Sequence, residues 1–220
     1  MGFIEVFRRY VIALRFALSG SRGYILTLAI QSIVIPATVA LLVFSSVIAT
    51  GSSNIEVATL MFVAVSLVTS IASVSTLTAS YAEPLMRDFL YSVYGSVKLP
   101  IAVAVTQVLI YVTIPAVIAA TILGNPLIIP LSYTGYTFTS SVGLLLASIL
   151  RDPMKTNTAS VLTYLALSAI APMSLSNDAP LILRLIPISV VNPANAWLTP
   201  YVLTLSATIY TVSIRRFEKI

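Results

Sequence analysis

Hydroxyl side chains are the chemically capable groups that this sequence places most regularly. Between residues 57 and 80, a serine or threonine recurs at alternating steps of three and four, which puts the hydroxyls on one face of a helix. The members of this stripe are Ser66, Thr69, Ser73, Thr76 and Ser80. Such a stripe predicts either close packing against a neighbouring helix or the polar lining of a substrate path.

The sequence offers no obvious base to activate these hydroxyls as nucleophiles, because no lysine lies within the apolar runs. There is no histidine and no cysteine, which removes the commonest general base, the thiolate nucleophile and the commonest metal ligands. Paired carboxylates at catalytic spacing and a glycine-rich phosphate loop are also missing. We therefore expect that the chain is not an enzyme and holds no metal or cofactor, and that any ATP is bound by another chain.

A second candidate site is the segment between Glu83 and Gly95. Pro84 suits the first turn of a helix, Glu83 favours its positive end, and Gly95 can cap its C-terminus. Between them, apolar residues recur at helical spacing, while Arg87, Asp88 and Tyr91 face another way. The predicted two-faced helix, Pro84–Tyr94, either docks in the groove of a partner or only reverses the direction of the chain.

Composition places these segments in a membrane protein. The 220-residue chain is 58% hydrophobic and 9% charged, and its mean hydropathy is +1.02. Soluble domains are about 45–50% apolar and about 25% charged. Twelve basic and seven acidic side chains cannot cover a water-soluble fold of this size. The composition therefore excludes a soluble enzyme, a nucleic-acid binder and a disordered chain.

Six mostly apolar runs are long enough to cross a bilayer, which takes about 20 residues. They are Gly23–Thr50, Val57–Ser80, Leu99–Leu123, Ile128–Leu150, Thr156–Met173 and Ala194–Ile214. No Asp, Glu, Lys or Arg lies in the middle of a run, which disfavours an ion relay inside the bilayer. The expected fold is an all-α integral membrane protein with one transmembrane domain. It consists of a six-helix bundle over residues 23–214 and a cytoplasmic tail over residues 215–220.

The fourth run carries an unusual number of hydroxyl groups in its first half. Against bare lipid these groups would be costly, so this half is expected to face protein or a cavity. The residues are Ser132, Tyr133, Thr134, Tyr136, Thr137, Thr139, Ser140 and Ser141.

Basic residues mark one side of the expected bundle. Eleven of the twelve Lys and Arg residues lie beside the termini or in connections on the same side as the termini. Only Arg184 lies on the other side. Because basic residues accumulate on the inner side of membrane proteins, both termini of this multi-pass chain are expected in the cytoplasm, with the bundle in the cell (plasma) membrane.

Residues 1–22 are expected to form an amphipathic helix in the inner membrane interface. Its apolar residues share one arc of the helical wheel, and Glu5 and Arg9 lie opposite that arc. Arg8 and Arg15 lie at one edge, from which their long side chains reach water and anionic headgroups. The alternative is a cytoplasmic extension of the first span.

The connection before the last run is expected to form short re-entrant helices in the outer leaflet. Residues 177–180 predict a helix cap and a first turn, Pro187 predicts the end of that helix, and residues 192–193 begin another. Asp178 and Arg184 are expected near its edge as a pair. The segment would act either as an exit gate or as a lid that seals the bundle.

Together these features resemble the membrane subunits of ABC transporters of the second exporter type, the polysaccharide- and drug-export permeases. The resemblance rests on six spans with both ends inside, an amphipathic N-terminal helix and a helix between spans two and three. The turn Arg151-Asp152-Pro153 and the proline-punctuated stretch over residues 185–194 are also similar to that family.

The resemblance implies that two permease subunits pair, as a homodimer or a heterodimer. Two cytoplasmic ATPase subunits, which bind ATP and magnesium, would hold the Pro84–Tyr94 helices. Export direction follows from the resemblance. The implied ATPase-coupling residues are Glu83, Leu85, Arg87, Asp88, Phe89, Leu90 and Tyr91, with Phe89 or Leu90 filling a groove of the ATPase. The candidates for the substrate path are Ser66, Thr69, Ser73 and Thr76.

Two other classes of function stay open at this stage. A channel or secondary transporter would work without an ATPase partner, and the transporter would depend on an ion gradient. A non-transporting membrane assembly subunit would bind a partner but would not change shape with nucleotide.

Overall fold

The computed structural model describes residues 7–13, 30, 34, 37–38, 41, 55–177 and 179–219. Within these ranges the chain forms helices and no strand, which confirms the all-α fold class. The long helices are α4 (Ile55–Ala79), α6 (Lys98–Leu123), α7 (Ile128–Leu150), α8 (Pro153–Leu175) and α10 (Thr199–Glu218). The short elements are η2 (Ser80–Ala82), α5 (Pro84–Tyr94), α9 (Leu181–Arg184), η3 (Pro187–Val191) and η4 (Pro193–Leu198).

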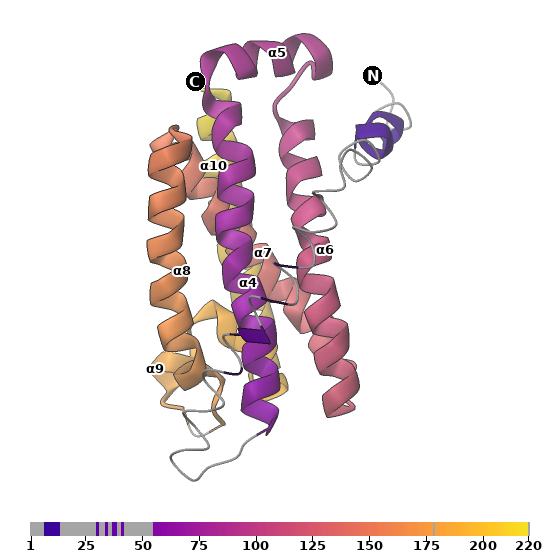
Figure 1. Ribbon diagram of the computed structural model, residues 1–220, viewed down its shortest axis with the longest axis vertical. Helices are drawn as coiled ribbons and strands as arrows, with labels where there is room; N and C mark the ends of the chain where they lie inside the picture. The colour runs from indigo at the N-terminus through magenta and orange to yellow at the C-terminus, as the bar shows by residue number, and fades with distance from the viewer. Residues whose placement is uncertain are drawn as a thin grey trace.

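The long helices alternate in direction along one bundle (Figure 1). Helices α4, α7 and α10 run toward the end that holds α5, and helices α6 and α8 run away from it. We call these the α5 end and the α9 end. At the α5 end, Nζ of Lys98 lies 2.7 Å from Oε1 of Glu218, so this ion pair joins the start of α6 to the end of α10.

Three of the described helices, α4, α6 and α8, are long and apolar enough to cross a membrane. They indicate a membrane protein, but they do not support the six spans expected from the sequence. The first expected run, Gly23–Thr50, lies almost wholly outside the described residues, as do residues 1–6 and 14–22 of the expected amphipathic segment. The fourth and sixth runs form α7 and α10, which are long enough but less apolar, because hydroxyl side chains interrupt both.

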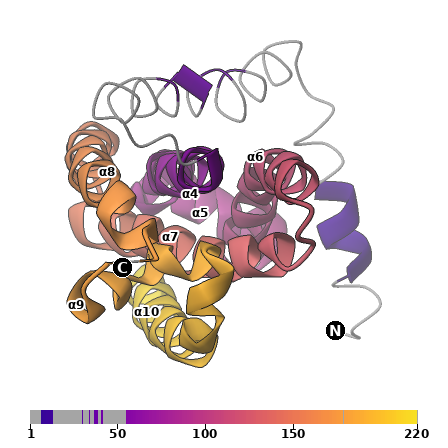
Figure 2. The same ribbon diagram turned by 90° about the horizontal axis from the view of Figure 1, so that it is seen from below.

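Helix α7, which carries the hydroxyl cluster, lies between α4 and α10 (Figure 2). It also contacts α6, α8 and η3. Most of its hydroxyls therefore face protein, one of the two environments expected for them. Oγ1 of Thr139 shares a 2.8 Å hydrogen bond with Oγ of Ser70 on α4, and Oγ of Ser140 is hydrogen-bonded to the phenol of Tyr210 on α10. The buried hydroxyl residues of α7 are Ser132, Thr134, Tyr136, Thr139, Ser140, Ser141 and Ser148.

Helices α4 and α7 approach closely because α7 lacks a side chain at two positions of their contact. A Cβ atom on Gly143 would lie 2.7 Å from the carbonyl oxygen of Ile71. A Cβ atom on Gly135 would lie 2.8 Å from Cδ1 of Leu67. Small residues allow membrane helices to pack in this way and to share hydrogen bonds. The two sites differ in what a new methyl group would meet, rigid backbone at Gly143 and a flexible side chain at Gly135.

This difference predicts that Gly143→Ala destabilises the bundle more than Gly135→Ala does. We expect Gly143→Ala to lower the free energy of unfolding by about 1–3 kcal/mol, because the backbone of α4 must move. Leu67 can rotate away from a methyl group at position 135, so that variant should stay close to the parent protein. Unfolding of both purified variants in detergent measures the difference, and equal losses would contradict the close contact at Gly143.

Candidate functional site

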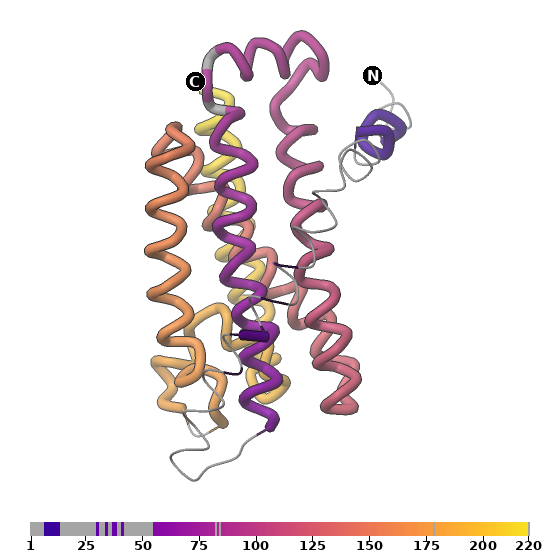
Figure 3. Tube along the Cα trace, viewed as in Figure 1, coloured from indigo at the N-terminus to yellow at the C-terminus, as the bar shows by residue number. Residues whose placement is uncertain are grey.

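The helix α5 has the bounds that the sequence predicted, Pro84 to Tyr94. Pro84 lies in its first turn, and the N–H of Arg87 donates to the carbonyl oxygen of Glu83 at 2.8 Å. Gly95 ends the helix with a φ of 72°, and its N–H donates to the carbonyl oxygen of Tyr91 at 2.9 Å. The Cα trace shows α5 crossing the end of the bundle from α4 to α6 (Figure 3).

The apolar face predicted for α5 is only partly buried. Leu90 is 5% exposed and belongs to the same apolar core as residues of α4 and α6. Leu85 is 87% exposed and Phe89 is 56% exposed. Leu90 therefore holds α5 against the bundle. Of the two residues expected to fill a partner's groove, only Phe89 is exposed enough to do so in this conformation.

The polar residues expected for coupling also lie along α5. The side chain of Asp88 is 73% exposed, and its Oδ1 lies 3.7 Å from Nε of Arg87. Such a long surface pair contributes little to stability, so Asp88 remains open to a partner's charge. Arg87 is half-buried, whereas Glu83 and Tyr91 are exposed. Five of the seven expected coupling residues are thus exposed: Glu83, Leu85, Asp88, Phe89 and Tyr91.

The hydroxyl stripe of α4 is satisfied largely by its own helix. Oγ of Ser66 donates to the carbonyl oxygen of Phe62 at 3.0 Å, and Oγ1 of Thr69 donates to that of Ser66 at 2.9 Å. Oγ of Ser73 donates to the carbonyl oxygen of Thr69 at 3.3 Å. Thr76 is exposed. This arrangement suits helix packing, and a substrate path along the stripe stays a prediction.

The segment at the α9 end is a short broken-helix insertion. Nε of Arg184 donates to the carbonyl oxygen of Ala179 at 2.9 Å, and the guanidinium also donates to that of Asn177. Asp178 lies outside the described residues, as does its expected pairing with Arg184. The cation therefore binds backbone oxygens of the turn that precedes α9. The next element along the chain, η3, is buried against α7.

Asn192 holds the parts of this insertion together. Its side chain is buried, and its Nδ2 donates to the carbonyl oxygen of Leu175 at 2.7 Å and to Oδ1 of Asn177 at 2.9 Å. Its Oδ1 accepts from the N–H of Ala194 at 2.9 Å and so caps η4. The sequence predicted the cap, but the links to the end of α8 could not be predicted from local signals.

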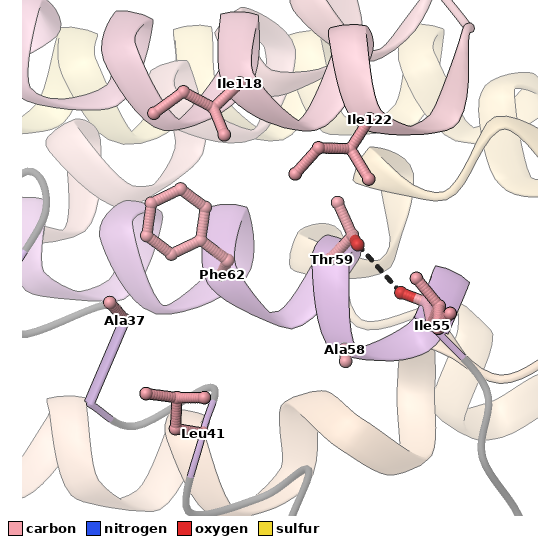
Figure 4. A pocket seen from close by; sticks show the side chains of 8 residues that line it. All are labelled: Ala37, Leu41, Ile55, Ala58, Thr59, Phe62, Ile118 and Ile122. Atoms are coloured by element: carbon pink, nitrogen blue, oxygen red, sulfur yellow. Dashed lines mark hydrogen bonds between the residues drawn. The ribbon is translucent and has the colours of Figure 1, made fainter.

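An apolar cavity of about 390 Å³ lies toward the α9 end, between α4, α6 and residues 37 and 41 (Figure 4). The one hydroxyl group among its described lining residues, Oγ1 of Thr59, donates to the carbonyl oxygen of Ile55 at 2.8 Å. The described lining therefore offers hydrocarbon and no unsatisfied polar side chain. No sequence pattern predicts this cavity, because ordinary apolar residues from distant segments form it. The lining residues are Ala37, Leu41, Ile55, Ala58, Thr59, Phe62, Ile118 and Ile122.

Two ionisable groups at the α5 end have shifted pKa values. The N–H of Lys155 and then that of Met154 donate to Oδ1 of Asp152, at 3.0 and 2.8 Å, and these bonds lower the pKa of Asp152. Burial, and then the neighbouring phenol of Tyr94, raise the pKa of Tyr81. Asp152 is thus the N-cap of α8 and stays ionised. In the described part of the chain, no three His, Cys, Asp or Glu side chains group as metal ligands.

No protein-family model, curated protein or solved structure matches this chain.

The role of Asn192 predicts a specific loss of stability. We expect Asn192→Ala to lower the free energy of unfolding by about 1–3 kcal/mol, because it leaves buried backbone groups without partners. Asn125 is the matched control, since its Oδ1 caps only the nearby N–H of Leu127, at 3.1 Å and near the surface. Asn125→Ala should cost less than about 1 kcal/mol. Equal melting temperatures for the two purified variants would contradict this role.

Proposed function

We propose that this chain is the transmembrane permease subunit of an ATP-driven exporter. It would form the substrate path as a dimer and would be coupled through α5 to separate cytoplasmic ATPase subunits, which bind ATP and magnesium. The observation that carries the proposal is the geometry of α5. Leu90 fixes this helix across one end of an antiparallel bundle, while Leu85 and Phe89 point away from it. Exposed apolar side chains of this size favour a partner surface.

The proposal includes six spans. Helices α7 and α10 contain 23 and 20 residues, and at about 1.5 Å per residue each is about 30 Å long, the thickness of a bilayer core. The low hydropathy of α7 is compatible with spanning because most of its hydroxyls contact protein instead of lipid. Residues 23–50 would supply the remaining span.

The charge distribution supports an orientation with the α5 end in the cytoplasm. Apart from Arg184, the basic residues of 55–177 and 179–219 belong to α5, to the helix ends or to the connections at the α5 end. These residues are Arg87, Lys98, Arg151, Lys155, Arg215, Arg216 and Lys219. Under the positive-inside rule this arrangement supports a topology with both termini in the cytoplasm.

Coupling would pass from α5 into the bundle through its two neighbouring helices. A closing ATPase dimer would shift α5, and Leu90 would transmit that shift to the core that α4 and α6 share. Tightly packed helices respond to such a push by switching between discrete packed arrangements. The apolar cavity between α4 and α6 would then change shape, which suits a cargo with a hydrocarbon portion.

The proposed topology can be tested by thiol labelling, because the chain has no cysteine of its own. We expect Met154→Cys, at the α5 end and outside the proposed partner surface, to be protected from a membrane-impermeant maleimide in intact cells and labelled in inside-out vesicles. Pro126→Cys, in the exposed connection between α6 and α7, should behave in the opposite way. Labelling of both positions from one side would overturn the orientation.

The proposed partner can be tested by purifying the chain in mild detergent from its own cells. We expect a stoichiometric ATPase subunit to accompany it, and Leu85→Glu to weaken that association at least tenfold, as loss of an interface anchor does. Met154→Glu is the matched control, because Met154 is 83% exposed at the same end but belongs to α8. Asp88→Arg should uncouple ATP hydrolysis from transport.

Three outcomes would contradict the assignment of α5. The first is equal loss of partner in the Leu85 and Met154 variants. The second is normal transport by the Asp88→Arg variant. The third is a chain that purifies without any nucleotide-binding partner in several detergents, which would favour a channel or secondary transporter instead.

A further inference from the structure

Two charged residues at the α5 end lie at helix termini that disfavour their charge. Lys98 is the first residue of α6, and Glu218 is the last residue of α10. The N-terminal end of a helix carries a partial positive charge, and the C-terminal end carries a partial negative charge. Each side chain therefore lies at a helix end of its own sign. The stability of the separate helices does not explain either residue, but their contact does, since Nζ of Lys98 lies 2.7 Å from Oε1 of Glu218.

We propose that this ion pair is an electrostatic latch, which closes the α5 end of the bundle and links the position of α5 to the end of α10. Lys98 is joined closely to α5, because Gly95 ends that helix and Oγ of Ser96 accepts from the N–H of Lys98 at 3.0 Å. A shift of α5 would therefore move Lys98 relative to Glu218. The latch responds to such a shift by opening or closing.

The two helices that the latch joins have few other direct contacts. Helix α7 packs against both α6 and α10, whereas α6 and α10 do not pack extensively against each other. Val97 and Phe217, the chain neighbours of the paired residues, are buried in one apolar core. This core holds the two backbones within reach of each other. The ion pair then adds a polar link that can open without unfolding either helix.

Exposure makes the latch reversible. The side chains of Lys98 and Glu218 are 59% and 38% exposed, so water and salt reach the pair. Exposed ion pairs are weak and are screened by salt, whereas a fully buried pair is costly to break. An open latch leaves each charge beside a helix end of its own sign, which favours closing it again. The latch belongs to the chain itself and does not depend on the proposed ATPase partner.

The test is hydrogen exchange of the full-length chain in mild detergent, measured on the helix that carries no substitution. The N–H of Lys219 donates to the carbonyl oxygen of Arg215 at 3.2 Å and reports on the end of α10. We expect Lys98→Met to speed exchange at Lys219 about two- to fivefold, because Glu218 loses its partner. Lys98→Glu should speed it further, since two carboxylates then repel each other.

The reverse measurement uses the start of α6, where the N–H of Ile101 donates to the carbonyl oxygen of Val97 at 3.2 Å. Glu218→Lys should speed exchange at Ile101, because two ammonium groups would then lie together. The double variant Lys98→Glu with Glu218→Lys restores an ion pair and also places each charge at a helix end of opposite sign. Exchange at both amides should then be as slow as in the parent protein or slower.

Lys155→Met is the matched control, because Lys155 is exposed in the first turn of α8 at the same end of the bundle. Among the described residues, no ion pair joins Lys155 to another helix, so this variant should leave exchange at Lys219 unchanged. Salt at about 1 M should speed exchange at Lys219 in the parent protein but not in the Lys98→Met variant.

Four results would each overturn the latch. They are unchanged or slower exchange at Lys219 in the Lys98 variants, fast exchange in the double variant, an equal effect of Lys155→Met, and the absence of a salt effect on the parent protein. None of these measurements uses an ATPase. A chain that keeps the latch but purifies without a nucleotide-binding partner would contradict the proposed function alone.

Discussion

The approach of α4 to α7 at Gly143 is the contact on which the arrangement of the other helices depends. Because position 143 has no side chain, the backbone of α4 near Ile71 can lie directly against α7. Close packing leaves α7 surrounded by protein, where Thr139 pairs with Ser70 of α4. A helix so rich in hydroxyl groups would be unfavourable against lipid. The same contact thus explains how a helix rich in hydroxyl groups can occupy the centre of the bundle.

Helix α5, at one end of this bundle, buries one of its apolar side chains and exposes others. Burial of Leu90 anchors it to the core of α4 and α6, whereas Leu85 and Phe89 remain exposed. Burying a side chain of this kind is worth about 1.5–3 kcal/mol. The two exposed residues therefore offer a partner several kcal/mol of possible stabilisation. The burial of these two side chains and the nearby charge of Asp88 are the interactions on which the proposed coupling through α5 would depend.

The α9 end follows a different constraint, which is that irregular backbone in an apolar environment must satisfy its own polar groups. Arg184 binds backbone carbonyl groups of its own turn, and Asn192 links α8 to η4 through three hydrogen bonds. With η3 also buried against α7, these bonds hold the described part of the segment in place, and its role as an exit gate or as a lid stays a prediction. An opening step would have to break these bonds together.

The sequence by itself determined the helical class and the bounds of α5, because prolines, glycines and apolar spacing act locally. Only the tertiary structure decided that Leu90 faces the core while Phe89 faces outward, since both fit the apolar face of the helix. Hydropathy could not settle the number of spans, because it does not record that the hydroxyls of α7 are buried against protein. The links made by Asn192 and the apolar cavity between α4 and α6 were also beyond the sequence. They arise from contacts between segments far apart in the chain, which no local pattern encodes.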